Sequence, residues 1–316
     1  MSLTRRELVR AAIAHEETGR IPYAFDFTPE AAARLQEHLG CEDLAGEIGN
    51  CIREVPPVWW RFANEPEDQK EPGAPSRLPD VIGVGSFDTM AETVTRLRET
   101  SDAFLLVRCY ASLFEKAWFV RGMENLLADM VLHPDYCEAL FERIVTADLN
   151  MLEMMLAADV DGVLLGCDWG SQQALLMSPP LWRRYVGSRH ARMFERIRGA
   201  GKYAFLHSCG NIVAVLPDVV AMGVQVVNPA QPECMDLRQL KAEFGGALTF
   251  WGGISTQQTL PRGTPAEVRA ETREVAALLG RGGGYILSPA QALQEDVPLE
   301  NVLAIVEEAR RISEGG

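Results

Sequence analysis

The stretch KYAFLHSCGNI, residues 202–212, shows most clearly the pattern that predicts the fold, a buried strand followed by reactive residues. It begins as a short apolar run and ends in His207, Ser208, Cys209 and Gly210, so reactive side chains directly follow a buried strand. Similar apolar runs recur, and helix-like stretches separate them, among them residues 134–157, 179–200 and 265–279. Strands that alternate with helices predict a parallel sheet whose two faces are covered. The other runs are residues 103–109, 161–167, 224–228, 248–253 and 285–289.

Two further runs raise the number of expected strands to seven or eight. They are IPYAFDF (21–27), near the N-terminus, and VIGVGSF (81–87). No GxGxxG turn opens a helix, so the signature of the dinucleotide-binding fold is missing and a closed barrel is favoured over an open sheet. We therefore expect residues 1–316 to form a single α/β domain, a (β/α)8 TIM barrel with an N-terminal helical arm.

A stretch rich in Pro, Trp and charge, residues 54–79, interrupts the alternation. A long excursion of this kind in a compact domain is typical of binding loops and subunit contacts. We interpret it as part of the barrel domain, and it suggests a homodimer.

Composition narrows the range of partners. The chain carries 44 acidic and 30 basic residues, a net charge of −14, which disfavours phosphate backbones and anionic lipid surfaces. Seven scattered cysteines without a CxxC motif indicate a reducing compartment. No run reaches the roughly 18 apolar residues of a membrane helix, and the first residues lack the apolar core of a signal peptide. We expect a cytoplasmic protein that binds neither nucleic acid nor membranes.

Candidate catalytic residues lie where the predicted strands end, because reactive groups of such barrels gather at the carboxyl ends of the strands. His207 and Cys209 are the most specific candidates, because imidazole and thiolate are both ligands that zinc prefers. Two ligands alone do not make a zinc site. Asp168 is a candidate general base, ligand or hydrogen-bonding anchor, or else a turn residue. Other strand ends supply candidate substrate-binding residues, namely Asp26, Arg108, Asn228, Trp251 and Gln291.

Several segments, taken in order between residues 117 and 310, resemble the uroporphyrinogen decarboxylase-like superfamily. This superfamily includes the decarboxylase of haem synthesis and the zinc methyltransferases that serve corrinoid proteins. The resemblance implies the barrel fold and an enzymatic activity. The segments are AWFVRGMENLLADM (117–130), GCDWGSQQALLMSPPLWRRY (166–185), FLHSCGNI (205–212), VNPAQPECMDLRQLKAEFGGALTFWGGISTQ (227–257) and GGGYILSPAQALQEDVPLENVLAIVEEAR (282–310).

The methyltransferase branch implies a zinc site that contains His207 and Cys209. Zinc would activate a small substrate or thiol for methyl exchange with a corrinoid, with Asp168 as a further catalytic residue. The corrinoid would belong to a partner protein, because the chain has no DxHxxG motif. That branch carries a third ligand, a late cysteine, at the position of Gln291, so Asp168 or Cys234 is left to complete the coordination.

Two other functions stay open at this point. A uroporphyrinogen decarboxylase, or a decarboxylase of a smaller acid, would need no metal and would use Asp26 or Asp168 against a pyrrole N–H. A porphyrinogen carries many carboxylates and needs several cations, yet GRIPYAFDFTPEAA (19–32) has no arginine after its strand; Arg108 and Arg121 are the candidates. The third function is a barrel that binds a ligand without catalysis.

Overall fold

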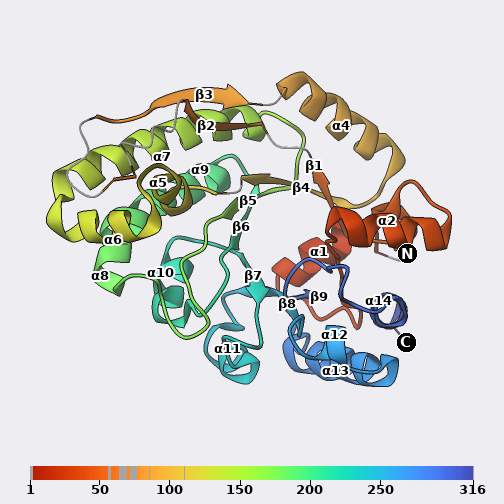
Figure 1. Cartoon of the computed structure of the whole chain (residues 1–316). Helices are drawn as coiled ribbons and strands as arrows, with labels where there is room; N and C mark the ends of the chain where they lie inside the picture. The colour runs from red at the N-terminus through yellow and green to blue at the C-terminus, as the bar shows by residue number, and fades with distance from the viewer. Residues whose placement is uncertain are drawn as a thin grey trace. The chain divides into compact units, whose positions relative to one another are not determined.

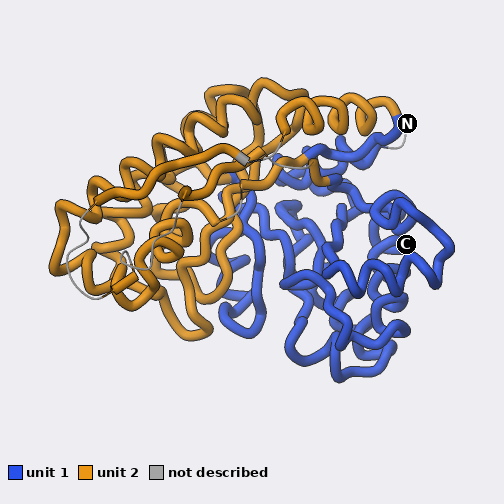
Figure 2. The backbone as a smooth tube through the Cα atoms, turned by 45° about the horizontal axis from the view of Figure 1, so that its top comes forward, with its two compact units in different colours: residues 1–53, 100–105, 225–316 blue, residues 54–99, 106–224 orange. Residues whose placement is uncertain are grey.

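The computed structural model describes residues 3–55, 58–63, 70–71, 77–84, 86–109 and 111–315. The chain divides into two compact units, which Figure 2 colours separately. Unit 1 comprises residues 1–53, 100–105 and 225–316, and unit 2 comprises residues 54–99 and 106–224. The expectation of a single domain stays a prediction. Among the described helices, none combines the length and the apolar character that crossing a membrane requires.

The fold is α/β and is built on a parallel sheet (Figure 1). Its seven strands follow the same order in the sheet as in the chain, and the described ladders β4–β5, β5–β6, β7–β8 and β8–β9 are all parallel. Every residue of β4 and β5 is buried, as continuous apolar runs predict for strands covered on both faces. The strands are β1 (Ile52–Val55), β4 (Phe104–Cys109), β5 (Gly162–Gly166), β6 (Tyr203–His207), β7 (Val226–Ala230), β8 (Thr249–Ile254) and β9 (Tyr285–Pro289).

Unit 1 carries the N-terminal helices and those that follow β7, β8 and β9. The predicted helix that begins at residue 265 is α13, where Thr264 and Glu267 form a reciprocal capping box and Pro265 occupies the first turn. Helices α13 and α14 run side by side (Figure 1), and Arg269 pairs with Glu307 between them. The helices are α1 (Arg5–Ile13), α2 (Pro29–Leu39), α3 (Leu44–Glu47), α11 (Leu237–Phe244), α12 (Thr259–Arg262), α13 (Pro265–Leu279) and α14 (Leu299–Glu314).

Unit 2 carries the longest helix, α7, which matches the helix expected from residue 134. The helix expected over residues 179–200 is one continuous run that contains a π-helical turn, η2, whose last residue, Gly187, packs against the side chain of Trp182. The helices are α4 (Phe87–Thr100), α5 (Phe114–Arg121), α6 (Met123–Leu132), α7 (Pro134–Leu156), α8 (Pro179–Trp182), η2 (Arg183–Gly187), α9 (Ser188–Gly199), η3 (Val213–Val215) and α10 (Leu216–Ala221).

The prediction that residues 81–87 form a strand of the parallel sheet is wrong. Residues 81–84 belong to β3 (Asp80–Val84), which pairs antiparallel with β2 (Trp59–Ala63) in a separate two-stranded sheet, and Phe87 already begins α4. Strand β2 lies within the Pro- and Trp-rich excursion, and its side chains alternate between exposed and buried. An apolar run identifies a strand but not its partner, so the sequence pattern could not distinguish the two sheets.

The predicted strand 21–27 is present in unit 1 as isolated pairs. Tyr23 forms a parallel bridge with Leu287 of β9, and the Leu287 N–H donates to the carbonyl of Pro22 at 2.8 Å. On its other side, the Tyr23 carbonyl accepts the N–H of Cys51 at 2.8 Å. The segment therefore lies between β9 and the residue that precedes β1, where an eighth strand is expected.

A buried charged cluster anchors helix α5 to α7 and β2. The indole N–H of Trp60 donates to Asp148 Oδ1 at 2.6 Å, and the Lys116 ammonium lies 4.0 Å from the same oxygen and 4.5 Å from the centre of the Trp60 ring. Burial raises the pKa of Asp148 to about 6, against the opposing effects of Lys116 and Trp60.

The loops that follow β5 and β6 touch backbone to backbone. The N–H of Asn211 donates to the carbonyl of Ser171 at 2.7 Å. Gly210 has a φ of +81°, and a Cβ built on it would lie 2.5 Å from the carbonyl oxygens of Gly170 and Ser171. Only a glycine fits this contact, which fixes the path of the chain directly after Cys209.

We expect Asp148→Asn to remove a pH dependence of stability. Because the folded-state pKa of about 6 lies above the ordinary value of 3.8, the folded protein binds more protons in this window, so rising pH lowers the stability that the group contributes. The free energy of unfolding of the wild type relative to the variant should fall by on the order of 2–3 kcal/mol between pH 4 and pH 7. Urea unfolding at several pH values measures it, with the exposed Asp135→Asn of the same helix as control. A difference that is flat or rises with pH contradicts the prediction.

We expect Gly210→Ala to destabilise the protein more than Gly201→Ala. Both glycines have left-handed backbones, but a Cβ at Gly201 meets no atom within 4 Å. Gly201→Ala should therefore cost about 1 kcal/mol of unfolding free energy from backbone strain alone, and Gly210→Ala about 3 kcal/mol or more, because its Cβ overlaps backbone atoms. Equilibrium urea unfolding of both variants measures the difference, and equal losses would disprove the steric argument.

Candidate functional site

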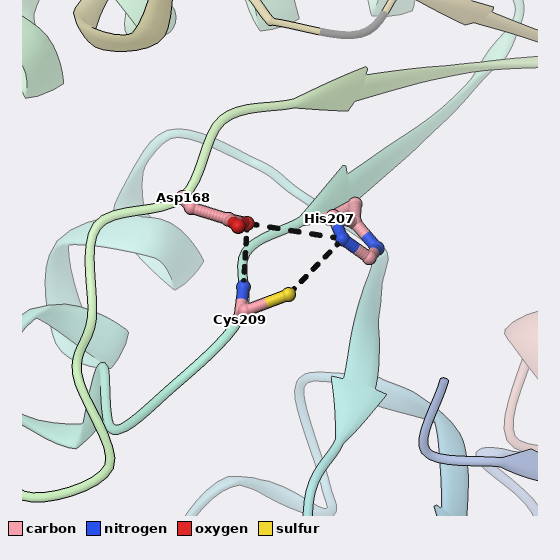
Figure 3. A group of neighbouring side chains, drawn as sticks. All are labelled: Asp168, His207 and Cys209. Carbon is pink, nitrogen blue, oxygen red and sulfur yellow. Dashed lines mark hydrogen bonds and ion pairs between the residues drawn. The ribbon is translucent and has the colours of Figure 1, made fainter. Parts of the chain in front are cut away.

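Asp168, His207 and Cys209 gather at the carboxyl ends of β5 and β6 (Figure 3). These strands are adjacent and parallel, with Gly166 opposite His207, so residues just beyond them emerge at the same edge. His207 Nε2 lies 3.4 Å from Cys209 Sγ and 3.8 Å from Asp168 Oδ1. One ligand atom from each residue lies within 4.8 Å of the other two. We call these three residues the trio, and all of them belong to unit 2.

Main-chain hydrogen bonds hold the trio together. The N–H of Cys209 donates to Asp168 Oδ1 at 2.9 Å, which joins the two loops through a charged acceptor. The N–H of Cys167 donates to the His207 carbonyl at 3.0 Å, and the N–H of Trp169 donates to Ser208 Oγ at 3.0 Å. The loops are therefore tied at residues that flank each side chain of the trio.

The trio has the donor atoms of a zinc site. Thiolate sulfur, imidazole nitrogen and carboxylate oxygen are the usual protein ligands of this ion, and tetrahedral coordination separates sulfur and nitrogen ligands by roughly 3.6 Å. The observed separation of 3.4 Å between Cys209 Sγ and His207 Nε2 fits that value. The side chains of His207 and Asp168 are 16% and 34% exposed, so the group is accessible from solvent.

Glu115, which the sequence interpretation missed, supports the trio from helix α5. The N–H of Asp168 donates to Glu115 Oε2 at 3.2 Å. Burial, and then the neighbouring Asp168 carboxylate, raise the pKa of Glu115 to about 7. Glu115 comes six residues after β4 ends, so it is not among the residues that directly follow a strand. Its signal in the sequence is a carboxylate in the first turn of the helix that follows a predicted strand.

Two other cysteines at strand ends differ from Cys209 in environment. Cys109 and Cys167 are buried, whereas Cys209 is partly exposed. Burial raises the pKa of the Cys109 thiol to about 12 and that of Cys167 well above its ordinary value. Cys234, the alternative completing ligand, is buried in unit 1, and burial raises its pKa as well. Of the two cysteines considered as ligands, Cys209 is thus the one in the trio.

The arginines proposed as carboxylate-binding groups in unit 2 are engaged with acidic side chains. Arg108 is buried and pairs with Glu54. Arg121 is 1% exposed, and its Nε lies 2.6 Å from Asp129 Oδ2. Both guanidinium groups therefore already have a carboxylate partner within the fold.

The remaining predicted substrate-binding residues lie in unit 1. The Asn228 side-chain amide donates to the Trp251 carbonyl at 3.2 Å, so the structure brings these two together. The Trp251 indole N–H donates to the carbonyl of Ala24 at 3.4 Å. Asp26 and Gln291 are partly exposed, and the carbonyl of Asp26 accepts the N–H of Leu293 at 2.8 Å. Their roles as substrate ligands stay predictions.

Comparison with known proteins gives relatives of two kinds, methyltransferases and uroporphyrinogen decarboxylases. The chain is 22% identical over 183 residues to the uroporphyrinogen decarboxylase of Coxiella burnetii, a match that covers 57% of this chain and 48% of the relative. The chain is 24% identical over 255 residues to the methylated-thiol–coenzyme M methyltransferase of Methanosarcina mazei, a match that covers 79% of this chain and 64% of the relative. It is 29% identical over 131 residues to the methylcobamide:CoM methyltransferase MtaA of Methanosarcina barkeri, covering 42% and 36%. The chain thus spans less than two thirds of each of these curated relatives.

The fold is that of a solved methyltransferase from Methanosarcina mazei, with a TM-score of 0.73, 18% identity and coverage of 98% of this chain and 99% of the other. A family model described as "Uroporphyrinogen decarboxylase (URO-D)" matches residues 54–312, which include the trio. This match covers most of the sequence, and it agrees with the resemblance found in the motifs. The chain belongs to the uroporphyrinogen decarboxylase (URO-D) family.

Proposed function

We propose that this protein is a methyltransferase that moves a methyl group between a small substrate or thiol and a corrinoid carried by a partner protein. The observation that carries the proposal is the trio, in which sulfur, nitrogen and oxygen donors from Asp168, His207 and Cys209 meet at one edge of the sheet. Two relatives are named for methyl transfer to coenzyme M, and one of those names includes a methylcobamide. The family match is compatible with the proposal.

The residues of the trio would divide the work as follows. Cys209 Sγ and His207 Nε2 would hold a zinc ion, and an Asp168 carboxylate oxygen would supply the third donor, because Gln291 stands at the position of the late cysteine. When bound, zinc would act as a Lewis acid that lowers the pKa of a substrate thiol, so that thiolate is available at neutral pH. The N–H of Cys209 keeps Asp168 Oδ1 directed toward the other two donors.

The fold that would carry this site is a (β/α)8 barrel. Support comes from the hydrogen bonds that residues 22–24 form with Leu287 of β9 and with Cys51, which directly precedes β1. In barrels of this type the loops at the carboxyl ends of the strands form the active site, which is where the trio lies.

A metal-free decarboxylase is the alternative that the family match keeps open. A porphyrinogen substrate needs cations to offset the desolvation of its carboxylates. Arg108 and Arg121 are the candidates in unit 2, and each is buried against a carboxylate of the chain, Glu54 and Asp129 respectively. Because both cations are already paired within the protein, the methyltransferase is the function that we favour.

Elemental analysis of the purified protein tests the zinc site. We expect about one zinc per chain in the wild type and a loss of at least roughly 90% of it in Cys209→Ser and His207→Ala, because each variant removes one of the three donors. Cys41→Ser, which changes a partly exposed cysteine of unit 1, should keep its zinc. A wild type without zinc, even after zinc is supplied, would refute the site.

Methyl transfer from methylcobalamin to a small thiol, followed by the absorbance of the cobalamin, tests the activity. The wild type should turn over, and Cys209→Ser should lose on the order of 100-fold or more of the rate, since it lacks the thiolate ligand. Cys41→Ser again serves as the control. Zinc-loaded wild type that transfers no methyl group to any thiol tested would contradict the proposed activity.

A further inference from the structure

The turn between β4 and α5 is fastened to the end of β5 at two points. Both the N–H and the hydroxyl of Ser112 donate to the carbonyl of Gly166, at 2.9 and 3.0 Å. Three residues later, Glu115 Oε2 accepts the N–H of Asp168 at 3.2 Å. Ser112 and Glu115 therefore bracket the peptide segment that leads from β5 to the trio.

The backbone of this turn adopts a costly conformation. Ala111 and Leu113 have φ values of 50° and 43°, in the left-handed region that residues other than glycine rarely adopt. Such residues persist only where the surroundings hold them, and Leu113 is fully buried, with its N–H directed at Asp148 Oδ2 at 3.5 Å. The strained turn leads directly into the first turn of α5, so the place of Glu115 is specified by the fold.

Asp168 depends on this support because its main chain has already left the sheet. Strand β5 ends at Gly166, and the Asp168 carboxylate must accept the N–H of Cys209 while it faces His207. The direction of that carboxylate follows from the orientation of the Asp168 peptide, whose N–H is held by Glu115. Glu115 does not belong to the group of ligand atoms formed by the trio in the described structure, so it acts through Asp168.

We propose that Glu115 is a positioning residue, whose side-chain oxygen holds the Asp168 peptide and thereby sets the third donor of the trio. The inference rests on the proposed zinc site. To hold the Asp168 N–H, residue 115 must offer a hydrogen-bond acceptor at the right distance. The length of its side chain therefore matters, and its negative charge does not.

Three substitutions separate these two properties. Glu115→Gln keeps the length and an acceptor oxygen but loses the charge, whereas Glu115→Asp keeps the charge but is one methylene shorter. Glu115→Ala loses both. Glu124→Ala removes an exposed carboxylate of the next helix, α6, and serves as the matched control. Thermal unfolding shows which variants fold, and if Glu115→Ala does not, the comparison of Glu115→Gln with Glu115→Asp decides.

Two measurements are made on each folded variant. Hydrogen exchange of the metal-free protein reports protection of the Asp168 amide, and competition with a chelator gives the zinc affinity. We expect Glu115→Asp and Glu115→Ala to exchange at least about 10-fold faster at this amide and to bind zinc roughly 10- to 100-fold more weakly, the usual effect of losing a residue that orients a ligand. Glu115→Gln and Glu124→Ala should stay within about 3-fold of the wild type in both measurements.

The outcomes separate this inference from the proposed function. Wild-type protein that binds no zinc overturns the metal site and the inference together. A wild type that binds zinc, with unchanged affinity or unchanged amide exchange in Glu115→Asp, overturns the inference alone. The reverse pattern, with Glu115→Gln impaired and Glu115→Asp normal, also overturns it, because Glu115 would then act through its charge.

Discussion

The parallel register of β5 and β6, with Gly166 opposite His207, is the constraint on which the candidate site depends. It brings the two strand ends to the same edge, so Asp168 and Cys209 emerge side by side and the hydrogen bond from the Cys209 N–H to Asp168 Oδ1 can form. The loops beyond can approach closely because Gly170 and Gly210 place no side chain between them. The pairing of the two strands and their loops therefore brings the side chains of the site close together.

Much of this arrangement could be predicted from the sequence. Strands covered on both faces are continuous apolar runs, so β4, β5 and β6 stood out, and the chemistry-bearing residues directly after them are restricted to one edge of a parallel sheet. His207 and Cys209 were therefore expected to lie close together. Asp168 was one of several possible partners, because spacing along the chain does not reveal which strand ends are neighbours. That information comes from the register of β5 against β6.

The features of the fold and the site that the sequence did not reveal depend on information that lies outside any local pattern. The run at 81–87 is apolar, but its pairing partner is β2, which the long excursion supplies. Residues 21–27 are suitably apolar, yet Pro22 has no N–H to donate to a ladder, and only isolated pairs form. Glu115 reaches Asp168 through a turn whose left-handed residues are Ala111 and Leu113, and neither residue type signals that conformation.

In the proposed zinc site, the charges of the ligands would match those of a divalent cation. A thiolate at Cys209 and a carboxylate at Asp168 carry two negative charges, and a neutral His207 adds none, so the trio would balance a doubly charged ion. Balance matters here because unpaired charge is costly to hold where solvent contact is limited, and His207 is only 16% exposed. A third anionic group, such as a second carboxylate, would exceed this balance if it entered the coordination. Glu115 instead faces the main chain of Asp168, and burial together with Asp168 raises its pKa to about 7. Because Glu115 bonds the main chain of Asp168, it supports the proposed ligands without adding its own charge to the coordination.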